Sequence, residues 1–116
     1  MEQINKLVNL SFLRKFTNND EEKLKHYIRV YLSTAEKMFG DLDKNRDSIS
    51  MEELYTRVHS LKPQTTYAGI LGLPEILIEI ETSIKNKAER AEIIEKLDRA
   101  IHLNQRGMEE LQTYLG

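Results

Sequence analysis

The sequence contains no cysteine among its 116 residues. A disulfide framework, a thiolate nucleophile and a zinc or iron–sulfur centre held by thiolates are therefore excluded. A chain of this length buries about two thirds of the surface that its unfolded form exposes, so one hydrophobic core can hold it together without a covalent or metal crosslink. We expect residues 1–116 to form one domain, a monomer, in a reducing compartment such as the cytoplasm.

Long apolar runs and basic stripes are missing as well. The most apolar stretch, Ile70 to Ile80, is interrupted by a glycine, a proline and two glutamates, and it is much shorter than the roughly 20 apolar residues of a transmembrane helix. The first residues show no basic segment followed by an apolar run, as a secretory signal would. The 17 Lys and Arg are scattered among 19 Asp and Glu, which gives no basic surface for phosphates. We expect neither a membrane nor a nucleic acid as partner.

Glycine and proline are scarce, with five and two residues, and no segment alternates apolar and polar side chains as a half-buried strand does. Apolar side chains instead recur every three or four residues, which is typical of amphipathic helices. Helices are expected from Leu10 to Phe16, from Asn18 or Asn19 to about Asp43, from Ser50 to about Tyr67, from Leu73 to Ile84 and from Ala91 to Leu115. Short links between long helices favour an all-α fold, an antiparallel four-helix bundle with a short additional N-terminal helix.

Helix starts and core faces follow from the same pattern. Asn18 or Asn19 is expected to cap the second helix, and Ser50 with Glu53 forms a capping box for the third. The second helix is expected to bury Leu24, Ile28, Tyr31, Ala35, Met38 and Leu42. The last helix is expected to bury Ala91, Ile94, Leu97, Ile101, Leu111 and Leu115, and its apolar pattern is interrupted around Asn104 to Gly107.

His59 lies in an unusual position on the third predicted helix. The core arc of this helix, at about 100° per residue, consists of Met51, Leu54, Val58, Leu61 and Thr65. A second arc, roughly a third of a turn away, holds Tyr55, His59, Lys62, Pro63 and Thr66. The positive charge of Lys62 favours a neutral imidazole at His59, and a neutral imidazole has a free ring nitrogen that can attack an electrophile. We expect Lys62 to affect reaction rate more than stability, because surface substitutions change stability little.

This arrangement resembles the histidine-containing phosphotransfer (HPt) domain of two-component phosphorelays. In that family a phosphorylatable histidine is followed by lysine three residues on, a small residue next, glycine ten residues after the histidine, and a Leu/Ile–Glu pair near the end of the following helix. The corresponding residues here are His59, Lys62, Pro63, Gly69, Ile80 and Glu81. The segments Leu10 to Leu13 and Asp20 to Glu21 are also similar to the opening of the family's domain, so the resemblance covers nearly the whole chain.

Proline stands where the family usually has glycine. Pro63 removes the amide hydrogen bond that residue 63 would give to the His59 carbonyl, and in a helix interior this costs about 3 kcal/mol. Thr65 and Ala68 continue the core arc beyond Pro63. We therefore expect the helix to kink at Pro63 and to continue to about Tyr67.

The resemblance implies that His59 accepts a phosphoryl group from the aspartyl phosphate of a receiver domain and that a second receiver collects it. Response-regulator receivers and a hybrid sensor kinase are the implied partners. The chain would lack autonomous kinase activity, would hold no nucleotide, metal or other cofactor, and would rely on Mg²⁺ bound by the receiver. The candidate receiver-docking residues are Tyr55, Pro63, Thr66, Gly69, Phe12 and Tyr27.

Two other histidine chemistries fit the sequence less well. A di-iron site in a helical bundle needs Glu-x-x-His pairs, but Lys23, Thr56 and Arg99 stand three residues before the histidines. The dimerisation domain of a histidine kinase carries proline five residues after its histidine, whereas here the spacing is four residues. That domain is also a two-helix hairpin, whereas this chain has five helical segments.

A helical adaptor is the alternative without phosphotransfer. Such a protein would dock a partner helix on exposed apolar residues, for which the candidates are Phe12, Phe16, Tyr27, Val30 and Tyr55. His26 and His102 have no lysine three residues later. We therefore assign these two histidines no role.

Overall fold

The computed structural model describes residues 6–116, and these residues form five α-helices. The helices are α1 (Ser11–Phe16), α2 (Glu21–Lys44), α3 (Met51–Ala68), α4 (Leu73–Lys85) and α5 (Arg90–Thr113). Within this part of the chain the only β-type pairing is an isolated bridge between Val8 and Ile70. The prediction of an all-α fold is confirmed, and each predicted helix is present.

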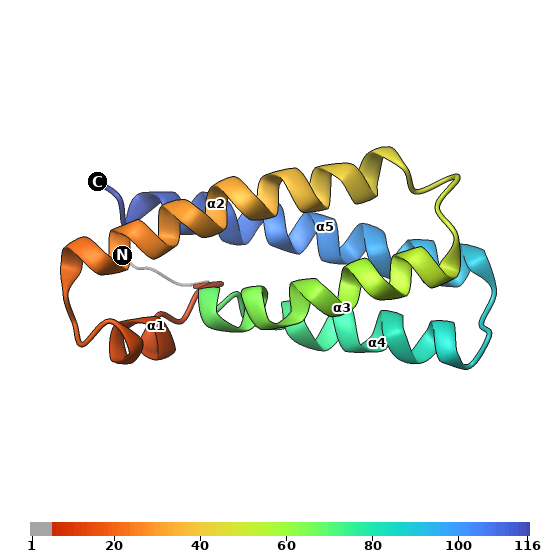
Figure 1. Cartoon of the computed structure of the whole chain (residues 1–116), viewed down its shortest axis with the longest axis horizontal. Helices are drawn as coiled ribbons and strands as arrows, with labels where there is room; N and C mark the ends of the chain where they lie inside the picture. Colours follow the sequence, from red (N-terminus) through yellow and green to blue (C-terminus); the bar gives the residue numbers. More distant parts are fainter. Residues whose placement is uncertain (1–5) are drawn as a thin grey trace.

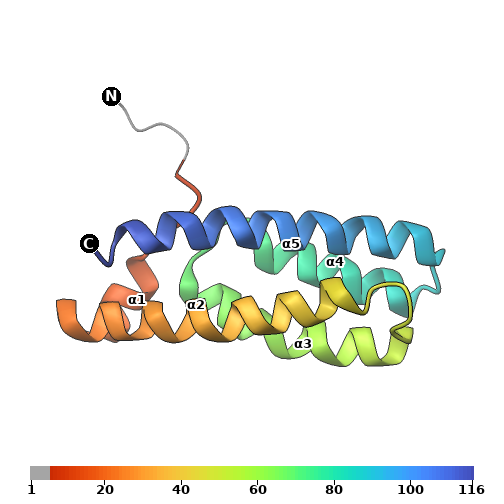
Figure 2. The same ribbon diagram turned by 90° about the horizontal axis from the view of Figure 1, so that it is seen from above.

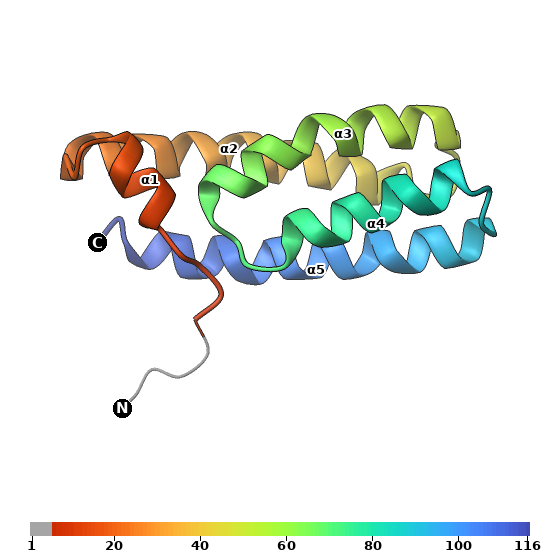
Figure 3. The ribbon, with the colours of Figure 1, turned by 90° about the horizontal axis from the view of Figure 1, so that it is seen from below.

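The four long helices lie along the 43 Å axis of the molecule, and the chain reverses direction at each link between them (Figure 1). Each long helix packs against two others, because α3 contacts α2 and α4, and α5 contacts α4 and α2. Figure 2 shows the same arrangement from above. The short helix α1 packs against α3 near the end at which α2 begins (Figure 3). None of the helices in residues 6–116 combines the length and the apolar character needed to cross a membrane.

Two helix starts show how the links are made. Ser50 caps α3 as predicted, because its side chain accepts a hydrogen bond from the backbone N–H three residues on at 3.0 Å. The cap of α2 is Asp20, which makes the same bond at 3.0 Å, and the prediction of Asn18 or Asn19 is wrong. Both asparagines have left-handed backbones, with φ of 56° and 60°. Asparagine tolerates this conformation, so the pair forms the turn, and the cap, which needs an extended backbone, moves to Asp20.

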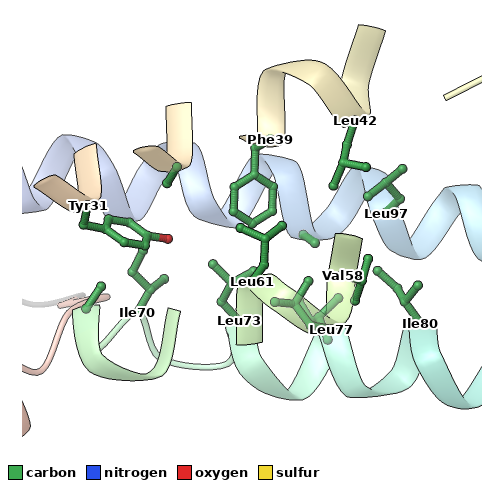
Figure 4. Packing of buried hydrophobic residues seen from close by; sticks show 14 of the residues in the cluster. Tyr31, Phe39, Leu42, Val58, Leu61, Ile70, Leu73, Leu77, Ile80 and Leu97 are labelled. Carbon is green, nitrogen blue, oxygen red and sulfur yellow. The ribbon is translucent and has the colours of Figure 1, made fainter. Parts of the chain in front are cut away.

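The core fills the space between the four long helices (Figure 4). On α2 the predicted face is largely confirmed, but Phe39 is buried where Met38 was expected, and Met38 is only half-buried. The predicted positions followed a strict 3.5-residue repeat, whereas a straight helix has 3.6 residues per turn and drifts by about 20° per heptad. This drift brings Phe39 inward, and Figure 4 shows its ring directed at Leu61 of α3.

Helix α5 runs without a break through Asn104 to Gly107, so the prediction of one last helix is confirmed. The buried residues of α5 are Ile93, Leu97, Ala100, Asn104, Gly107 and Leu111. The buried amide of Asn104 accepts a hydrogen bond from the Tyr31 hydroxyl of α2 at 2.6 Å. At Gly107 the backbone approaches Ile70 so closely that a Cβ would lie 2.8 Å from the Ile70 side chain. Because both contacts lie in the core, the face of α5 that carries Asn104 and Gly107 is buried, and this face differs from the predicted one.

The predicted core of α5 is therefore partly wrong. Leu97 and Leu111 are buried as expected. Ile94, Ile101 and Leu115 are only half-buried, and Ala91 is exposed. Ile93 and Ala100, one residue before two of the expected positions, are buried in their place. The buried face of α5 thus includes Asn104 and Gly107, the polar and small residues at which the apolar pattern was interrupted.

The segment before α1 ties the link between α3 and α4 to α5. The backbone N–H of Asn9 donates to the Gly69 carbonyl at 2.8 Å. The carboxylate of Glu110, on α5, accepts hydrogen bonds from the backbone N–H groups of Leu7 at 2.7 Å and Val8 at 3.1 Å. Three parts of the chain that are far apart in the sequence are joined here, at the C-terminal end of α3.

Candidate functional site

His59 projects from the outer side of α3. Its side chain is 64% exposed, whereas Val58 and Leu61 on the same helix are fully buried. The apolar stripe of α3 packs against the core and thereby fixes the rotation of the helix. The prediction that His59 points away from the core is confirmed.

Glu81 of α4 joins His59 to Lys62. One carboxylate oxygen, Oε2, lies 2.8 Å from Nδ1 of His59, and the other, Oε1, accepts a hydrogen bond from Nζ of Lys62 at 2.7 Å. The side chain of Glu81 is only 8% exposed, and its neighbour Ile80 is fully buried in the core. Packing of α4 on α3 therefore holds this carboxylate beneath both residues.

The charge of Glu81 determines which nitrogen of His59 is free. Burial alone would raise the pKa of Glu81, but the hydrogen bonds from Lys62 and His59 outweigh burial and hold this pKa below its ordinary value. The carboxylate is therefore ionised at neutral pH and can only accept hydrogen bonds. In neutral His59 the proton must then be on Nδ1, which leaves the lone pair on Nε2.

Lys62 is less exposed than its predicted arc implies. Its side chain is 26% exposed, and its ammonium is paired with the buried Glu81. Removal of one partner of such a pair leaves the other charge desolvated without compensation. The expectation that Lys62 contributes little to stability is therefore revised, because this side chain neutralises a buried charge.

Tyr55 and Lys85 extend the site on the other side of His59. The Tyr55 ring, one turn before His59 on α3, is nearly parallel to the imidazole, with 6.2 Å between ring centroids and 7° between planes. The ammonium of Lys85, on α4, lies 5.5 Å from the centroid of the Tyr55 ring. Interaction with the Tyr55 hydroxyl and then the proximity of Glu81 raise the pKa of Lys85. The ammonium is therefore charged at neutral pH.

Helix α3 continues through Pro63 to Ala68, as predicted. Beyond the proline, the hydroxyls of Thr65 and Thr66 both donate to the Lys62 carbonyl, at 3.0 Å and 2.9 Å. The side-chain amide of Gln64 donates to the Ser60 carbonyl at 3.2 Å. Side chains thus add hydrogen bonds to this part of the helix. Pro63 is exposed and lies on the surface between the site and α1.

An apolar groove, which we call the aromatic groove, lies where α1, α2 and α3 meet. It has a volume of about 390 Å³ and is lined by Phe12, Leu13, Phe16, Tyr27, Val30, Pro63 and Tyr67. Phe12 and Phe16 are 55% and 61% exposed, which is unusual for side chains of this size. The Phe16 ring meets Tyr27 edge to face at 5.4 Å. Through Pro63, this groove adjoins the face of α3 that carries His59.

The structure brings some docking candidates together and separates others. Phe12, Tyr27 and Pro63 share the aromatic groove, whereas Tyr55 stacks on His59. Thr66 is exposed on α3 outside the groove lining. Gly69 ends α3 in the left-handed conformation, with φ of 77°, and a Cβ there would overlap the Asn9 carbonyl oxygen. The backbone itself thus requires glycine at this position.

The remaining histidines lie elsewhere on the surface. His26 of α2 contacts Tyr27 edge to face, and His102 is exposed on α5. In residues 6–116 no group of three or more His, Cys, Asp or Glu side chains is arranged to hold a metal ion. His59 is the histidine in this part of the chain whose ring contacts a carboxylate that also binds an ammonium.

From the sequence, Glu81 was recognised as part of a motif but not as a site residue. Lys85 was not recognised as a site residue. A glutamate next to the apolar Ile80 was the available signal for Glu81, since a carboxylate at the edge of a core needs a partner. No family model, curated protein or solved structure matches this chain. The interpretation of the site therefore depends on the spacing of its residues and on the geometry of His59, Glu81 and Lys62.

Proposed function

We propose that this chain is a histidine phosphotransfer protein that carries a phosphoryl group between receiver-domain aspartates on Nε2 of His59. The observation that supports this most strongly is the hydrogen-bonded chain of His59, Glu81 and Lys62, which holds Nδ1 of an exposed imidazole against a carboxylate and leaves Nε2 outside this chain. The fold proposed with it is an antiparallel four-helix bundle of α2 to α5, with α1 at one end. The cytoplasm, where receivers act, is the proposed location.

Each group at the site has a part in the transfer. The Nε2 lone pair of His59 attacks phosphorus, and the bond between phosphorus and the aspartyl oxygen breaks, so that the receiver's carboxylate leaves with the electron pair. Positive charge then develops on the imidazole, whose Nδ1–H faces the Glu81 carboxylate. In a loose transition state, catalysis consists mainly of positioning and charge neutralisation. Glu81 orients the imidazole ring, Lys62 neutralises the charge of Glu81, and the receiver contributes Mg²⁺.

The aromatic groove supports a protein as the phosphoryl donor. Exposed aromatic side chains are typical of surfaces that bind another protein. Phe12, Tyr27 and Pro63, three of the docking candidates, lie together there, and Pro63 is the residue after Lys62. A receiver bound on this groove would bring its aspartyl phosphate to the His59 face of α3.

The test is transfer from a panel of phosphorylated receivers, with radiolabel or phosphate-affinity gels as the readout. We expect at least one receiver to label the wild type with an acid-labile phosphate. His59→Gln should fold and accept nothing, whereas the matched variant His102→Gln, also exposed on a long helix, should be labelled like the wild type. Labelling of His59→Gln at the wild-type rate would overturn the assignment.

A helical adaptor is the second candidate, and the aromatic groove is the observation that favours it. An adaptor would bind its partner through Phe12 and Phe16 and would acquire no acid-labile phosphate. Its binding would be unchanged in His59→Gln and lost in Phe12→Ser. The two candidates therefore differ in both the labelling and the binding result.

A further inference from the structure

The pairing of Lys62 with Glu81 leaves neither charge free to act as counter-ion of a phosphoryl group on His59. Lys62 already binds the Glu81 carboxylate at 2.7 Å, so these two charges cancel. A phosphoryl group adds a charge of about −1.5 to −2 at neutral pH. If Lys62 turned to the phosphoryl group, the buried Glu81 would lose its cation. A second positive group is therefore needed near Nε2.

Lys85 is placed to be that group. It lies one helical turn after Glu81 on α4, on the same side of the helix, and its side chain is exposed. Its ammonium lies over Tyr55, whose ring is stacked on the imidazole of His59. Tyr55 thus connects Lys85 to His59.

The contact between Lys85 and Tyr55 leaves the ammonium available. Exposed cation–π contacts are weak, and lysine has a flexible stem with a compact charge. A dianion that forms on His59 would attract this ammonium more strongly than the Tyr55 ring does. Tyr55 keeps Lys85 nearby without neutralising it, in contrast to the pairing of Lys62 with Glu81.

We propose that Tyr55 and Lys85 form a second wall of the site, in which Tyr55 positions the imidazole by stacking and Lys85 is the counter-ion of the phosphoryl group on Nε2. This inference rests on the proposed function, because the anion is the group that His59 would carry. The wall acts on the lifetime of phosphohistidine. Attack through Nε2 leaves the ring protonated on Nδ1. A cation beside the phosphoryl group favours release of this proton to water and stabilises the dianion, and both effects slow hydrolysis.

The first experiment phosphorylates the purified protein with phosphoramidate, a small donor that requires no receiver, and follows hydrolysis by ³¹P NMR after the donor is removed. Lys85→Gln should shorten the half-life of phosphohistidine about threefold or more, since one unit charge is lost beside a dianion. Lys85→Arg should keep a half-life close to that of the wild type. The matched control is Lys87→Gln, which removes the same charge two residues later from an exposed turn and should change nothing.

The second experiment concerns Tyr55 and needs no phosphate. NMR of the unphosphorylated protein reports the ring-proton shifts of His59, which depend on the stacked ring. Tyr55→Phe should leave these shifts close to wild type, and Tyr55→Leu should move them toward values of an unstacked histidine. Equal shifts in the two variants would overturn the positioning role.

The possible failures can be told apart. If phosphoramidate labels no histidine in the wild type, the proposed function and the counter-ion role both fall. If His59 is labelled but Lys85→Gln and Lys87→Gln hydrolyse at the same rate, only the role of Lys85 is overturned. A shorter half-life in Lys85→Gln with a wild-type half-life in Lys85→Arg supports the proposal.

Discussion

At the scale of single residues, the bond between His59 and Glu81 determines the chemistry of the imidazole. Nδ1 faces a carboxylate that stays ionised, so the outer nitrogen, Nε2, is the nucleophile in the proposed transfer. We expect the phosphoryl group on Nε2 and on no other histidine. The check is ¹⁵N–³¹P NMR of the phosphorylated protein with labelled histidine. A phosphorus atom bound to Nδ1 would mean that the imidazole ring flips away from Glu81 before it reacts.

Glu81 also makes stability depend on pH. The folded state lowers the pKa of this carboxyl from its ordinary value of 4.5, so the ionised form stabilises the fold above pH 4.5. This contribution is lost as the pH falls through the lower pKa of the folded state. Glu81→Gln should cost about 1–3 kcal/mol at pH 7, because Lys62 loses its charged partner.

Urea unfolding of the wild type and Glu81→Gln measures this effect. The difference in unfolding free energy should shrink below pH 4.5, because the wild type then loses the ionised carboxylate as well. A difference of the same size at pH 7 and at pH 3 would show that the charge of Glu81 contributes nothing to stability.

At the scale of helices, Pro63 is an exposed proline inside α3. Its replacement by alanine restores an amide that can donate to the His59 carbonyl. Pro63→Ala should therefore raise the free energy of unfolding by at least about 1 kcal/mol, with only a modest change in phosphotransfer. Pro63→Arg should block transfer from a receiver, because a long side chain would stand in the aromatic groove. Thermal unfolding and transfer kinetics check the two variants, and a less stable Pro63→Ala protein would contradict this account.

Replacement of Gly69 tests the close contact at the end of α3, and replacement of Gly40 on α2 is the comparison. Gly69 has a positive φ, and a Cβ there would overlap Asn9, so Gly69→Ala should destabilise the protein by about 1–3 kcal/mol. Gly40 on α2 is helical and has nothing within 4 Å of its Cβ position. Gly40→Ala should therefore stabilise by about 0.5–1 kcal/mol. Chemical denaturation measures both variants, and equal effects would argue against the close contact at Gly69.

The helix ends could largely be predicted from the sequence, because the residues that set them are local. Ser50 caps α3, and Gly69 ends it, as the pattern indicated. The buried face of α5 could not be predicted in full. Asn104 and Gly107 interrupt the apolar pattern in the sequence. They are buried because they contact Tyr31 and Ile70, which lie on distant parts of the chain.

The candidate site shows the same division between local and distant information. His59 and Lys62 could be identified from their spacing on one helix. The bridge through Glu81 and the position of Lys85 depend on how α4 is set against α3, and no local pattern fixes that register. Sequence spacing identified the candidate histidine, and tertiary packing determines how it is held.

At the scale of the whole molecule, Tyr31 and Asn104 join α2 to α5 across the core. Tyr31→Phe leaves the buried Asn104 oxygen without its donor and should cost about 1–3 kcal/mol in urea unfolding. Tyr114→Phe, at a half-buried tyrosine near the end of the chain, is the matched control and should be close to neutral. A neutral Tyr31→Phe would mean that another group replaces the hydroxyl.

The same tyrosine affects alkaline stability. Burial, with a smaller contribution from Tyr67, raises the pKa of Tyr31 far above its ordinary value of 10.0. The neutral hydroxyl therefore favours the folded state, and stability is lost as the pH rises above 10. Tyr31→Phe should lose less stability than the wild type over this range.

The bonds from Leu7 and Val8 to Glu110 span 103 and 102 residues of the chain. On the ribosome, the segment that is made early must wait for α5 before these bonds can form. The end of α3 at Gly69, ten residues after His59, is held by that same segment. A nascent chain that lacks α5 would therefore carry His59 on an unfinished fold, so the final setting of this histidine depends on the synthesis of α5.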